Sequence, residues 1–151
     1  MIVTPYDKFL FHVQLIFEEK RLKTFKEWPF DDDKPCSAQK LAEAGFYFAG
    51  SAADPDAVQC FLCDKALDGW DEEDDPWEEH LSHSENCEFA KLKQHEAALT
   101  YEQLTNFKKQ LLIKSIKKCA EELKRDVDDL YNARLHKIKK FVRALKSRIA
   151  I

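Results

Sequence analysis

Residues 60–87, CFLCDKALDGWDEEDDPWEEHLSHSENC, hold the most informative pattern in the chain. It opens with the pair Cys60 and Cys63; sixteen residues follow before His80, and six more before Cys87. Zinc takes four ligands in tetrahedral geometry, and three thiolates with one imidazole form a closed structural site. Such a site keeps no open position for a reactive water, so metal-assisted hydrolysis is not expected. The spacing therefore predicts one structural zinc ion.

Spacing alone does not decide which histidine binds the metal. His80 and His83 lie three residues apart on one expected helix, so they share a face and compete. Two alternatives to a zinc site stay open, namely four unrelated core residues or redox chemistry at the Cys-x-x-Cys pair. The redox alternative explains neither His80 nor Cys87, and the agreement of the pair with the later His and Cys favours zinc.

Composition predicts a folded protein inside the cell. Of 151 residues, 44% are apolar and 12% aromatic, which suffices for a core. Five cysteines, an odd number with three of them near two histidines, indicate metal rather than disulfides in a reducing compartment. The sequence has no run of eighteen apolar residues, and Met1–Lys8 does not read as a secretory signal. We therefore expect a protein of the nucleus and cytoplasm without a membrane partner.

Charge divides the chain into an acidic front and a basic rear. Residues 1–93 hold 10 Lys and Arg against 21 Asp and Glu, a formal −11, whereas residues 94–151 hold 14 against 7, a formal +7. Together they give the net charge of −4. The front should attract cationic partners and the rear acidic ones.

Turn-forming residues occur only in the first half of the chain. All five prolines and all three glycines precede residue 77, which leaves the second half free for long helices. In the first half, hydrophobic spacing and turn residues predict two helices and two strand-like pieces, with a turn at Asp54–Asp56 between the strands. The expected ranges are Phe9–Leu22, Ser37–Ala44 with Ser37 as cap and Gly45 as stop, Gly45–Ala49 and Ala57–Phe61.

Two further helix starts can be read from capping residues. Asp75 is expected as an N-cap, with Pro76 at the first helical position and Glu78 completing a capping box. Thr100 and Gln103 form a second capping box, and no helix breaker follows it. About fifty helical residues would extend roughly 75 Å. We expect such a rod not to fold back onto a domain of about ninety residues.

With these motifs in place, the chain resembles the baculovirus inhibitor-of-apoptosis repeat (BIR) family. The motifs that carry the resemblance, over about residues 15–105, are Arg21–Phe30, Leu41–Tyr47, Gln59–Cys63, Leu67–Trp70 and Asp74–His80. The resemblance implies an α+β fold, in which a small zinc-stabilised BIR domain of short helices around a three-stranded antiparallel sheet precedes one long C-terminal α-helix. It also assigns His80 as the fourth zinc ligand. The expected parts are an N-terminal segment (1–14), the BIR zinc domain (15–93), a linker (94–99) and a long amphipathic helix for partner binding (100–151).

The Cys-x-x-Cys pair of Cys60 and Cys63 forms the expected zinc knuckle. The acidic stretch between this knuckle and the two histidines has two interpretations. Carboxylates of residues 75–79 suit a solvated turn and a complement to the helix dipole. Asp68 and Asp74 flank Trp70 outside that helix, and two carboxylates beside an aromatic wall can hold an amino-terminal ammonium and a small apolar side chain. These three residues therefore favour a peptide-binding groove.

The resemblance implies that this groove binds the N-terminus of a phosphorylated histone tail. Asp68 and Asp74 would hold the free amine of the peptide. Leu67 and Trp70 would enclose an alanine methyl, and Lys65 and His83 would contact a phosphate on the third residue of the peptide. Asp68 stands where glutamate is usual in the family, one methylene shorter. The alternative for His83 is a surface residue or a spare zinc ligand. The implied peptide-binding residues are Lys65, Leu67, Asp68, Trp70, Asp74 and His83.

Along the expected long helix, apolar residues recur at intervals of three and four, and charged residues fill most other faces. This is a coiled-coil-like stripe, and a single exposed helix would present more apolar surface than a monomer tolerates. The helix therefore needs another helix, and the alternative is a hairpin broken near Lys124–Asp129. The expected interface residues are Leu104, Phe107, Leu111, Ile116, Leu123, Val127, Leu135, Ile138, Val142 and Leu145.

For this arrangement of one repeat and one helix, the resemblance implies a three-helix bundle with borealin and the inner centromere protein. That places the chain in the chromosomal passenger complex, which directs Aurora B kinase at the centromere, spindle midzone and midbody. Family relatives also form homodimers near Leu99–Leu104. Contact of the basic helix with DNA or a nucleosome is a further expectation.

Two functions follow from these expectations. The first is a non-enzymatic mitotic adaptor that reads a histone tail and recruits partner helices. The alternative is an inhibitor of apoptosis that binds N-terminal Ala peptides or restrains caspases through the same groove. An enzyme has little support, because Cys119 has no adjacent base. A nucleic-acid zinc finger is disfavoured, because the finger region is acidic.

Overall fold

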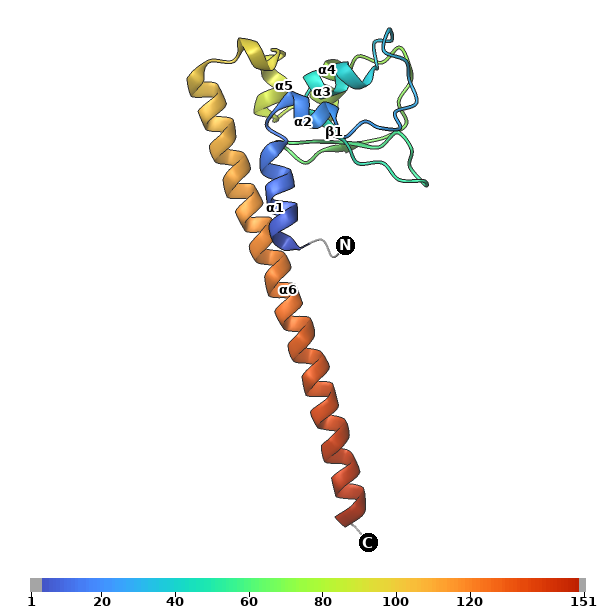
Figure 1. The fold of residues 1–151 in the computed structure, drawn as a ribbon, viewed down its shortest axis with the longest axis vertical. Helices are drawn as coiled ribbons and strands as arrows, with labels where there is room; N and C mark the ends of the chain where they lie inside the picture. Colours follow the sequence, from blue (N-terminus) through green and yellow to red (C-terminus); the bar gives the residue numbers. More distant parts are fainter. Residues whose placement is uncertain (1–3, 150–151) are drawn as a thin grey trace.

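The computed structural model describes residues 4–149, and Figure 1 shows a small domain at one end of a long helix. The elements in order are α1 (Pro5–Gln14), α2 (Glu18–Leu22), α3 (Ala38–Glu43), β1 (Phe46–Phe48), β2 (Val58–Cys60), β3 (Ala66–Leu67), α4 (Pro76–His83), α5 (Glu88–Leu92), the 3-10 helix η1 (Glu96–Ala98) and α6 (Tyr101–Ile149). The expected α+β fold is confirmed. The division into parts 1–14, 15–93, 94–99 and 100–151 stays a prediction, and its portions on residues 1–3 and 150–151 lie outside the described residues. Within residues 4–149, none of the helices combines the length and apolar character that a membrane crossing requires.

The sheet is antiparallel with strand order β1-β2-β3. Phe46 pairs with Cys60 and Phe48 with Val58, while Val58 also pairs with Leu67 of the short β3. This register places Cys60, the first of the predicted zinc ligands, at the end of the central strand β2. It also places Leu67 at the sheet edge, beside the loop that leads to Trp70.

The expected single helix from Phe9 to Leu22 is wrong, because the chain turns between α1 and α2. Arg21 is fully buried, and its Nη1 donates to the carbonyl oxygens of Leu15 and Ile16 at 2.8 and 2.9 Å. In a continuous helix those carbonyls would accept from backbone amides one turn later. Burial lowers the pKa of Arg21 to about 10, so the guanidinium stays charged at neutral pH and needs these acceptors. A tertiary contact therefore overrides helical periodicity here.

Local signals predicted α3 and the start of α4, whereas α5 and η1 were not predicted. Asp75 caps α4 by accepting from the amides of Trp77 and Glu78 at 2.8 and 3.1 Å. The capping box expected at Glu78 is wrong, since its carboxylate pairs with Lys93 instead. Ser37 occupies the N-cap position of α3, although its side chain makes no capping bond. Gly45 follows α3 with φ +91°, a left-handed conformation that glycine adopts without strain.

The long helix α6 runs unbroken over 49 residues, so the hairpin broken near Lys124–Asp129 is wrong. Its capping box is confirmed, since the amides of Thr100 and Gln103 each donate to the other side chain, at 2.8 and 3.2 Å. The expectation that the rod stays clear of the domain is wrong for its first turns. Phe107 and Leu111 of α6 are only 3% and 1% exposed, and both belong to the chain's own core.

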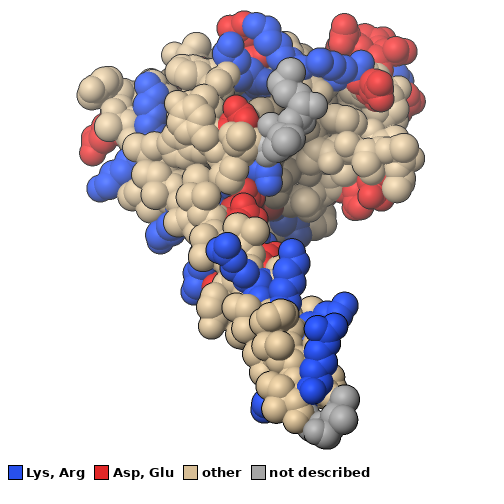
Figure 2. All heavy atoms as spheres, turned by 60° about the horizontal axis from the view of Figure 1, so that its bottom comes forward, with Lys and Arg blue, Asp and Glu red and all other residues tan. Residues whose placement is uncertain are grey.

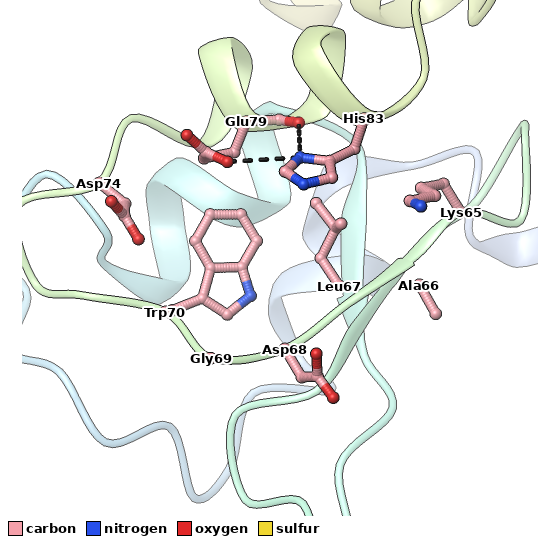
Figure 3. Close-up of a pocket in the computed structure, with 9 residues that line it drawn as sticks. All are labelled: Lys65, Ala66, Leu67, Asp68, Gly69, Trp70, Asp74, Glu79 and His83. Atoms are coloured by element: carbon pink, nitrogen blue, oxygen red, sulfur yellow. Dashed lines mark hydrogen bonds and ion pairs between the residues drawn. The ribbon is translucent and has the colours of Figure 1, made fainter.

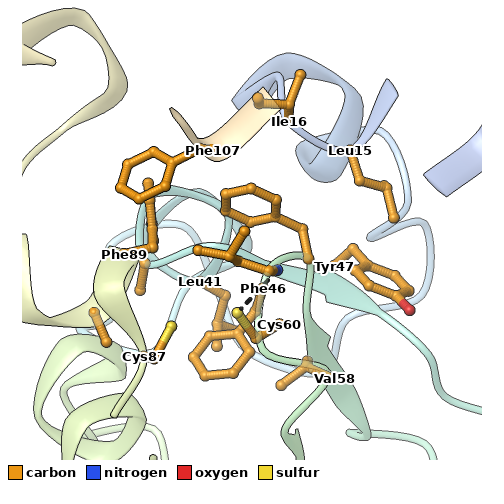
Figure 4. Close-up of a cluster of buried hydrophobic side chains, with 14 of the residues drawn as sticks. Leu15, Ile16, Leu41, Phe46, Tyr47, Val58, Cys60, Cys87, Phe89 and Phe107 are labelled. Atoms are coloured by element: carbon orange, nitrogen blue, oxygen red, sulfur yellow. Dashed lines mark hydrogen bonds between the residues drawn. The ribbon is translucent and has the colours of Figure 1, made fainter. Parts of the chain in front are cut away.

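The core lies between the sheet, α5 and the start of α6 (Figure 4). Phe89 is its centre: its ring meets Phe61 at 5.0 Å and Phe107 at 5.8 Å between centroids. The helix α1 packs beside α6 and runs opposite to it (Figure 1), with an ion pair between Lys8 and Glu122 at 3.2 Å. Beyond this contact α6 projects away from the domain.

Candidate zinc site and peptide groove

The four predicted zinc ligands lie together, and their ligand atoms all fall within 4.8 Å of one another. Cys60 ends β2, Cys63 follows in the turn, His80 lies on α4, and Cys87 is the residue before α5. The amides of Leu62 and Cys63 donate to the Cys60 sulfur at 3.3 and 3.4 Å, which orients this knuckle. Segments distant in sequence thus supply one compact donor set of three sulfurs and one nitrogen that fits a zinc ion.

The geometry separates the two histidines. The Nδ1 of His80 lies 2.8 Å from the carbonyl oxygen of Ala44, which can only accept, so Nδ1 carries the hydrogen. The Nε2 of His80 then faces the cluster, 3.6 Å from the Cys63 sulfur. In contrast, Nδ1 of His83 lies 3.1 Å from the backbone oxygen of Glu79 and 3.4 Å from its carboxylate, outside the cluster. His80 is therefore the histidine that could bind an ion.

The electrostatics of the cluster favour a cation. Hydrogen bonds from Cys60 and Cys87 hold the pKa of the Cys63 thiol far below its usual range, which favours the thiolate form that binds a metal. Burial lowers the pKa of His80, but its bonds to Cys63 and Cys87 outweigh this and raise the pKa to about 9. The cluster thus favours positive charge at Nε2, where a metal ion would bind with release of the ligand protons.

Sequence reasoning missed a second contact to the knuckle, made by α6. The Nζ of Lys114 donates to the carbonyls of Phe61 and Leu62 at 2.7 and 2.8 Å and to Asp64 at 2.9 Å. Asp64 has φ +62°, and Lys118 binds its other oxygen at 2.8 Å. The long helix therefore holds the turn that carries Cys63.

All six predicted peptide-binding residues line one groove of about 260 Å³ between β3, the loop after it and α4 (Figure 3). In Figure 3, Lys65 and Asp74 lie toward opposite ends of the groove, with Leu67 and Trp70 between them. The remaining lining residues, which the sequence did not single out as site residues, are Ala66, Gly69 and Glu79.

Glu79 has a second place in the structure that was not predicted from the sequence. It lies in the first turn of α4, where a carboxylate complements the helix dipole as expected, and it also lines the groove and pairs with His83 at 3.4 Å. The signal was present, because positions 79 and 83 are one helical turn apart and share a face. A third carboxylate therefore joins Asp68 and Asp74 in the groove.

Trp70 is held in place and carries a free donor. Its backbone amide donates to Asp56 at 2.8 Å, and its ring packs against Phe46 at 5.7 Å between centroids. The indole Nε1 is buried and has no hydrogen-bond partner among residues 4–149. A buried donor without a partner is costly, so a ligand atom that accepts from it gains affinity. Asp74 is also fixed, since its Oδ2 accepts from the amide of Asp71 at 2.8 Å.

The predicted helix-interface residues divide into two groups. Phe107 and Leu111 are core residues and Leu104 packs against the core, so these three are not free for a partner. From Ile116 onward the apolar side chains are exposed or half-buried. The members of this second group are Ile116, Leu123, Val127, Leu135, Ile138, Val142 and Leu145.

Comparison with known proteins identifies the family to which this fold belongs. The model of the BIR family, described as the Inhibitor of Apoptosis domain, matches residues 21–91. The Baculoviral IAP repeat-containing protein 5 of Rattus norvegicus is 40% identical over 97 residues, which cover 64% of this chain and 68% of the relative. Protein 5.2 of the same name from Xenopus tropicalis is 49% identical over 80 residues, covering 53% of this chain and 51% of the relative. A solved structure, DIAP1 BIR1 bound to a Grim peptide, is 39% identical, covers 50% of this chain and 71% of that chain, and has a TM-score of 0.43.

The chain belongs to the BIR family. Within this family it is survivin-like, since its relatives are the Baculoviral IAP repeat-containing proteins 5. BIR domains bind zinc, and the cluster of three cysteines and His80 could hold one ion.

Proposed function

We propose that the chain is a non-enzymatic adaptor whose groove reads the N-terminus of a phosphorylated histone tail. The observation that carries this proposal is the lining of the groove, which combines three carboxylates, an apolar wall, Lys65, His83 and an indole donor that has no partner among residues 4–149. A free N-terminal ammonium suits the carboxylate end, and a small side chain suits the wall of Leu67 and Trp70. A phosphate two residues later suits the cationic end.

In this proposal one structural zinc ion, held by Cys60, Cys63, His80 and Cys87, fixes the groove. His80 and the groove residue Glu79 are neighbours on α4, and Cys63 precedes Lys65 by two residues. The ion therefore ties together the two sides of the groove. With four protein ligands it has no position for substrate, which agrees with a binding role.

The groove is tested with a peptide that begins with a free Ala and carries phosphothreonine at position three. We expect N-acetylation of the peptide, or Asp74→Asn, to weaken binding about tenfold or more, which is about 1.4 kcal/mol. The Asn side chain keeps an acceptor for the amide of Asp71, so this change removes charge without removing the loop contact. Asp32→Ala is the matched control, because it removes one exposed carboxylate outside the groove. Equal affinity for free and acetylated peptides would rule out the groove.

The same peptide without the phosphate separates the two candidate functions. An inhibitor of apoptosis that binds N-terminal Ala peptides or restrains caspases would keep its affinity without the phosphate. A histone-tail reader would lose affinity, and Lys65→Ala would produce the same loss only with the phosphorylated peptide. The apoptotic function is favoured only if neither change matters.

The long helix is proposed to join borealin-like and inner-centromere-protein-like helices, which would bring the chain to Aurora B kinase at the centromere, spindle midzone and midbody. The support is the exposed apolar stripe of α6, which starts at Ile116. A pull-down from mitotic cells should compare the full chain with a chain that ends at Asp129. The shorter chain keeps Phe107, Leu111 and the contact with α1, so its domain stays folded. We expect it to bind the histone peptide and to lose the passenger partners; retention of those partners would place their site elsewhere.

A further inference from the structure

The outer part of α6 presents one straight apolar line to solvent. Ile116, Val127, Ile138 and Ile149 recur every eleven residues and are 53%, 63%, 56% and 79% exposed. An eleven-residue repeat has a period close to that of a straight helix, so these residues share one line along it. Between them, further apolar residues widen the line into a stripe, and they are Ala120, Leu123, Tyr131, Leu135, Val142 and Leu145.

The helix α1 does not cover this stripe. Its residues Pro5, Lys8 and His12 meet α6 around Ser115 and Glu122. With 3.6 residues per turn, those two positions lie about 100–120° around α6 from the line of the repeat. The stripe is therefore open in the single chain.

Charge along the same segment is separated into two blocks. Residues 121–129 hold five Asp and Glu against two Lys and Arg, a formal −3, whereas residues 130–149 hold seven Lys and Arg and no acidic residue, a formal +7. Figure 2 shows the end of α6 coming forward with Lys and Arg in blue beside an uncharged tan surface. Two such segments packed in parallel would place their two basic blocks against each other. Because like charges repel, the parallel arrangement is unfavourable.

The stripe is also nearly symmetric about a point between Arg134 and Leu135. Reversing the segment about this point exchanges three apolar pairs, which are Ala120 with Ile149, Val127 with Val142, and Tyr131 with Ile138. Leu123 and Leu145 lie one residue away from exchanging with each other. A segment with this property can pack on a second copy of itself in the antiparallel sense, as an isologous two-fold contact requires.

We propose that residues 120–149 of α6 form an antiparallel two-helix contact with a second copy of this chain. In that arrangement residues on one flank of the stripe meet the same flank of the copy. Glu121 then lies opposite Lys146 of the copy, and Asp128 opposite Lys139, with each pair occurring twice. All four side chains are exposed in the single chain. On the other flank Leu130 meets Phe141 of the copy, which is an apolar contact. Near the two-fold axis Arg134 meets Lys137 of the copy, and the repulsion between these like charges destabilises the dimer.

The contact differs from a homodimer formed near Leu99–Leu104. The overlap ends at Ala120, about one turn beyond Ile116, so the zinc domains lie at opposite ends of the rod. Phe107 is roughly 27 residues from the axis, and at 1.5 Å per residue the two domains are about 80 Å apart. A homodimer near Leu99–Leu104 would place them side by side. This inference concerns the free chain and does not rest on the histone-tail or passenger-complex function.

Two charge-reversal variants of the full chain test the proposal. The basic variant carries Glu121→Lys and Asp128→Lys; the acidic variant carries Lys139→Glu and Lys146→Glu. Analytical ultracentrifugation of the wild type should give a concentration-dependent dimer, and each variant alone should raise the dimer dissociation constant about tenfold or more. An equimolar mixture of the two variants should form a heterodimer, because every reversed pair is then attractive again.

The outcomes are decisive in both directions. A wild type that stays monomeric at about 100 μM, or a dimer indifferent to both variants, overturns the proposal. Each variant remains helical because the substitutions lie on an exposed face, which circular dichroism checks. Small-angle scattering of the dimer should show two domains separated along a rod, and adjacent domains would assign the dimer to the Leu99–Leu104 region. A chain ending at Asp129 lacks most of the stripe and should dimerise at least about tenfold more weakly than the full chain. Equal dimerisation of the two chains would also overturn the contact.

Discussion

The imidazole of His80 donates its Nδ1 hydrogen to the carbonyl oxygen of Ala44 at 2.8 Å. Ala44 is the C-cap of α3, and the next residue, Gly45, has φ +91°. The turn after α3 therefore orients the metal-binding nitrogen of a histidine 36 residues later. Such outer contacts to a ligand histidine fix its tautomer and strengthen its binding.

Removal of the metal should unfold the zinc domain. Structural zinc contributes about 10–16 kcal/mol of apparent binding free energy at pH 7, more than a domain of this size gains from its core. We expect a chelator to abolish the near-UV circular dichroism of Trp28, Trp70 and Trp77. His80→Ala should lose the bound zinc, while His83→Ala should keep one ion per chain by metal analysis. The reverse pattern would contradict the ligand assignment.

Gly45→Ala should destabilise the domain strongly. An added Cβ would lie 2.8 Å from Cδ1 and Cε1 of Phe89, and the positive φ is strained for any side chain. Strain and overpacking together should cost about 3 kcal/mol, measured by thermal unfolding of the zinc-loaded chain. Gly69→Ala is the control, because Gly69 has φ +74° but nothing lies within 4 Å of its added Cβ. It should lose only the strain, about 1 kcal/mol; equal losses would contradict the packing argument.

Lys114→Met should weaken both the fold and the hold on the metal. The change removes three hydrogen bonds, including those to the carbonyls of Phe61 and Leu62 beside the zinc knuckle. We expect a loss of about 1–3 kcal/mol in stability and faster release of zinc to a chromogenic chelator. Lys118→Met removes only an exposed ion pair to Asp64 and should cost less than about 0.5 kcal/mol. Similar release rates in the two variants would mean that α6 does not support the knuckle.

Trp70→Phe should reduce peptide affinity without reducing stability. The phenyl ring keeps the apolar wall and its contact with Phe46, and it removes a buried donor that has no partner among residues 4–149. Loss of one ligand hydrogen bond should weaken binding about five- to tenfold, measured by calorimetry. Trp77→Phe is the control, since Trp77 stacks on Phe89 away from the groove. Unchanged affinity after Trp70→Phe would show that the indole donor does not contact the peptide.

Local chemistry made much of this protein predictable. Asp75 and Thr100 were identified as helix starts because capping depends on residues three positions apart. Gly45 was identified as a helix stop because the left-handed conformation favours glycine. In contrast, the helix expected over Phe9–Leu22 failed because its periodicity carried no information about the buried Arg21. The carbonyls of Leu15 and Ile16 bond to that guanidinium instead of to the next helical turn.

Three features could be read from the amino-acid sequence alone. They are the donor set of three thiolates and one imidazole, the groove residues between its two halves, and the stripe along the last helix. Each of these depends on residue types at fixed spacing. Three further points depend on tertiary contacts. His80 faces the cysteine cluster where His83 does not, because the Ala44 carbonyl orients it, which agrees with the ligand that the family resemblance implied and that spacing left open. Phe107 and Leu111 belong to the core while the stripe from Ile116 is open. Glu79 faces the groove. These outcomes depend on contacts between residues far apart in the chain, which spacing within one segment does not contain.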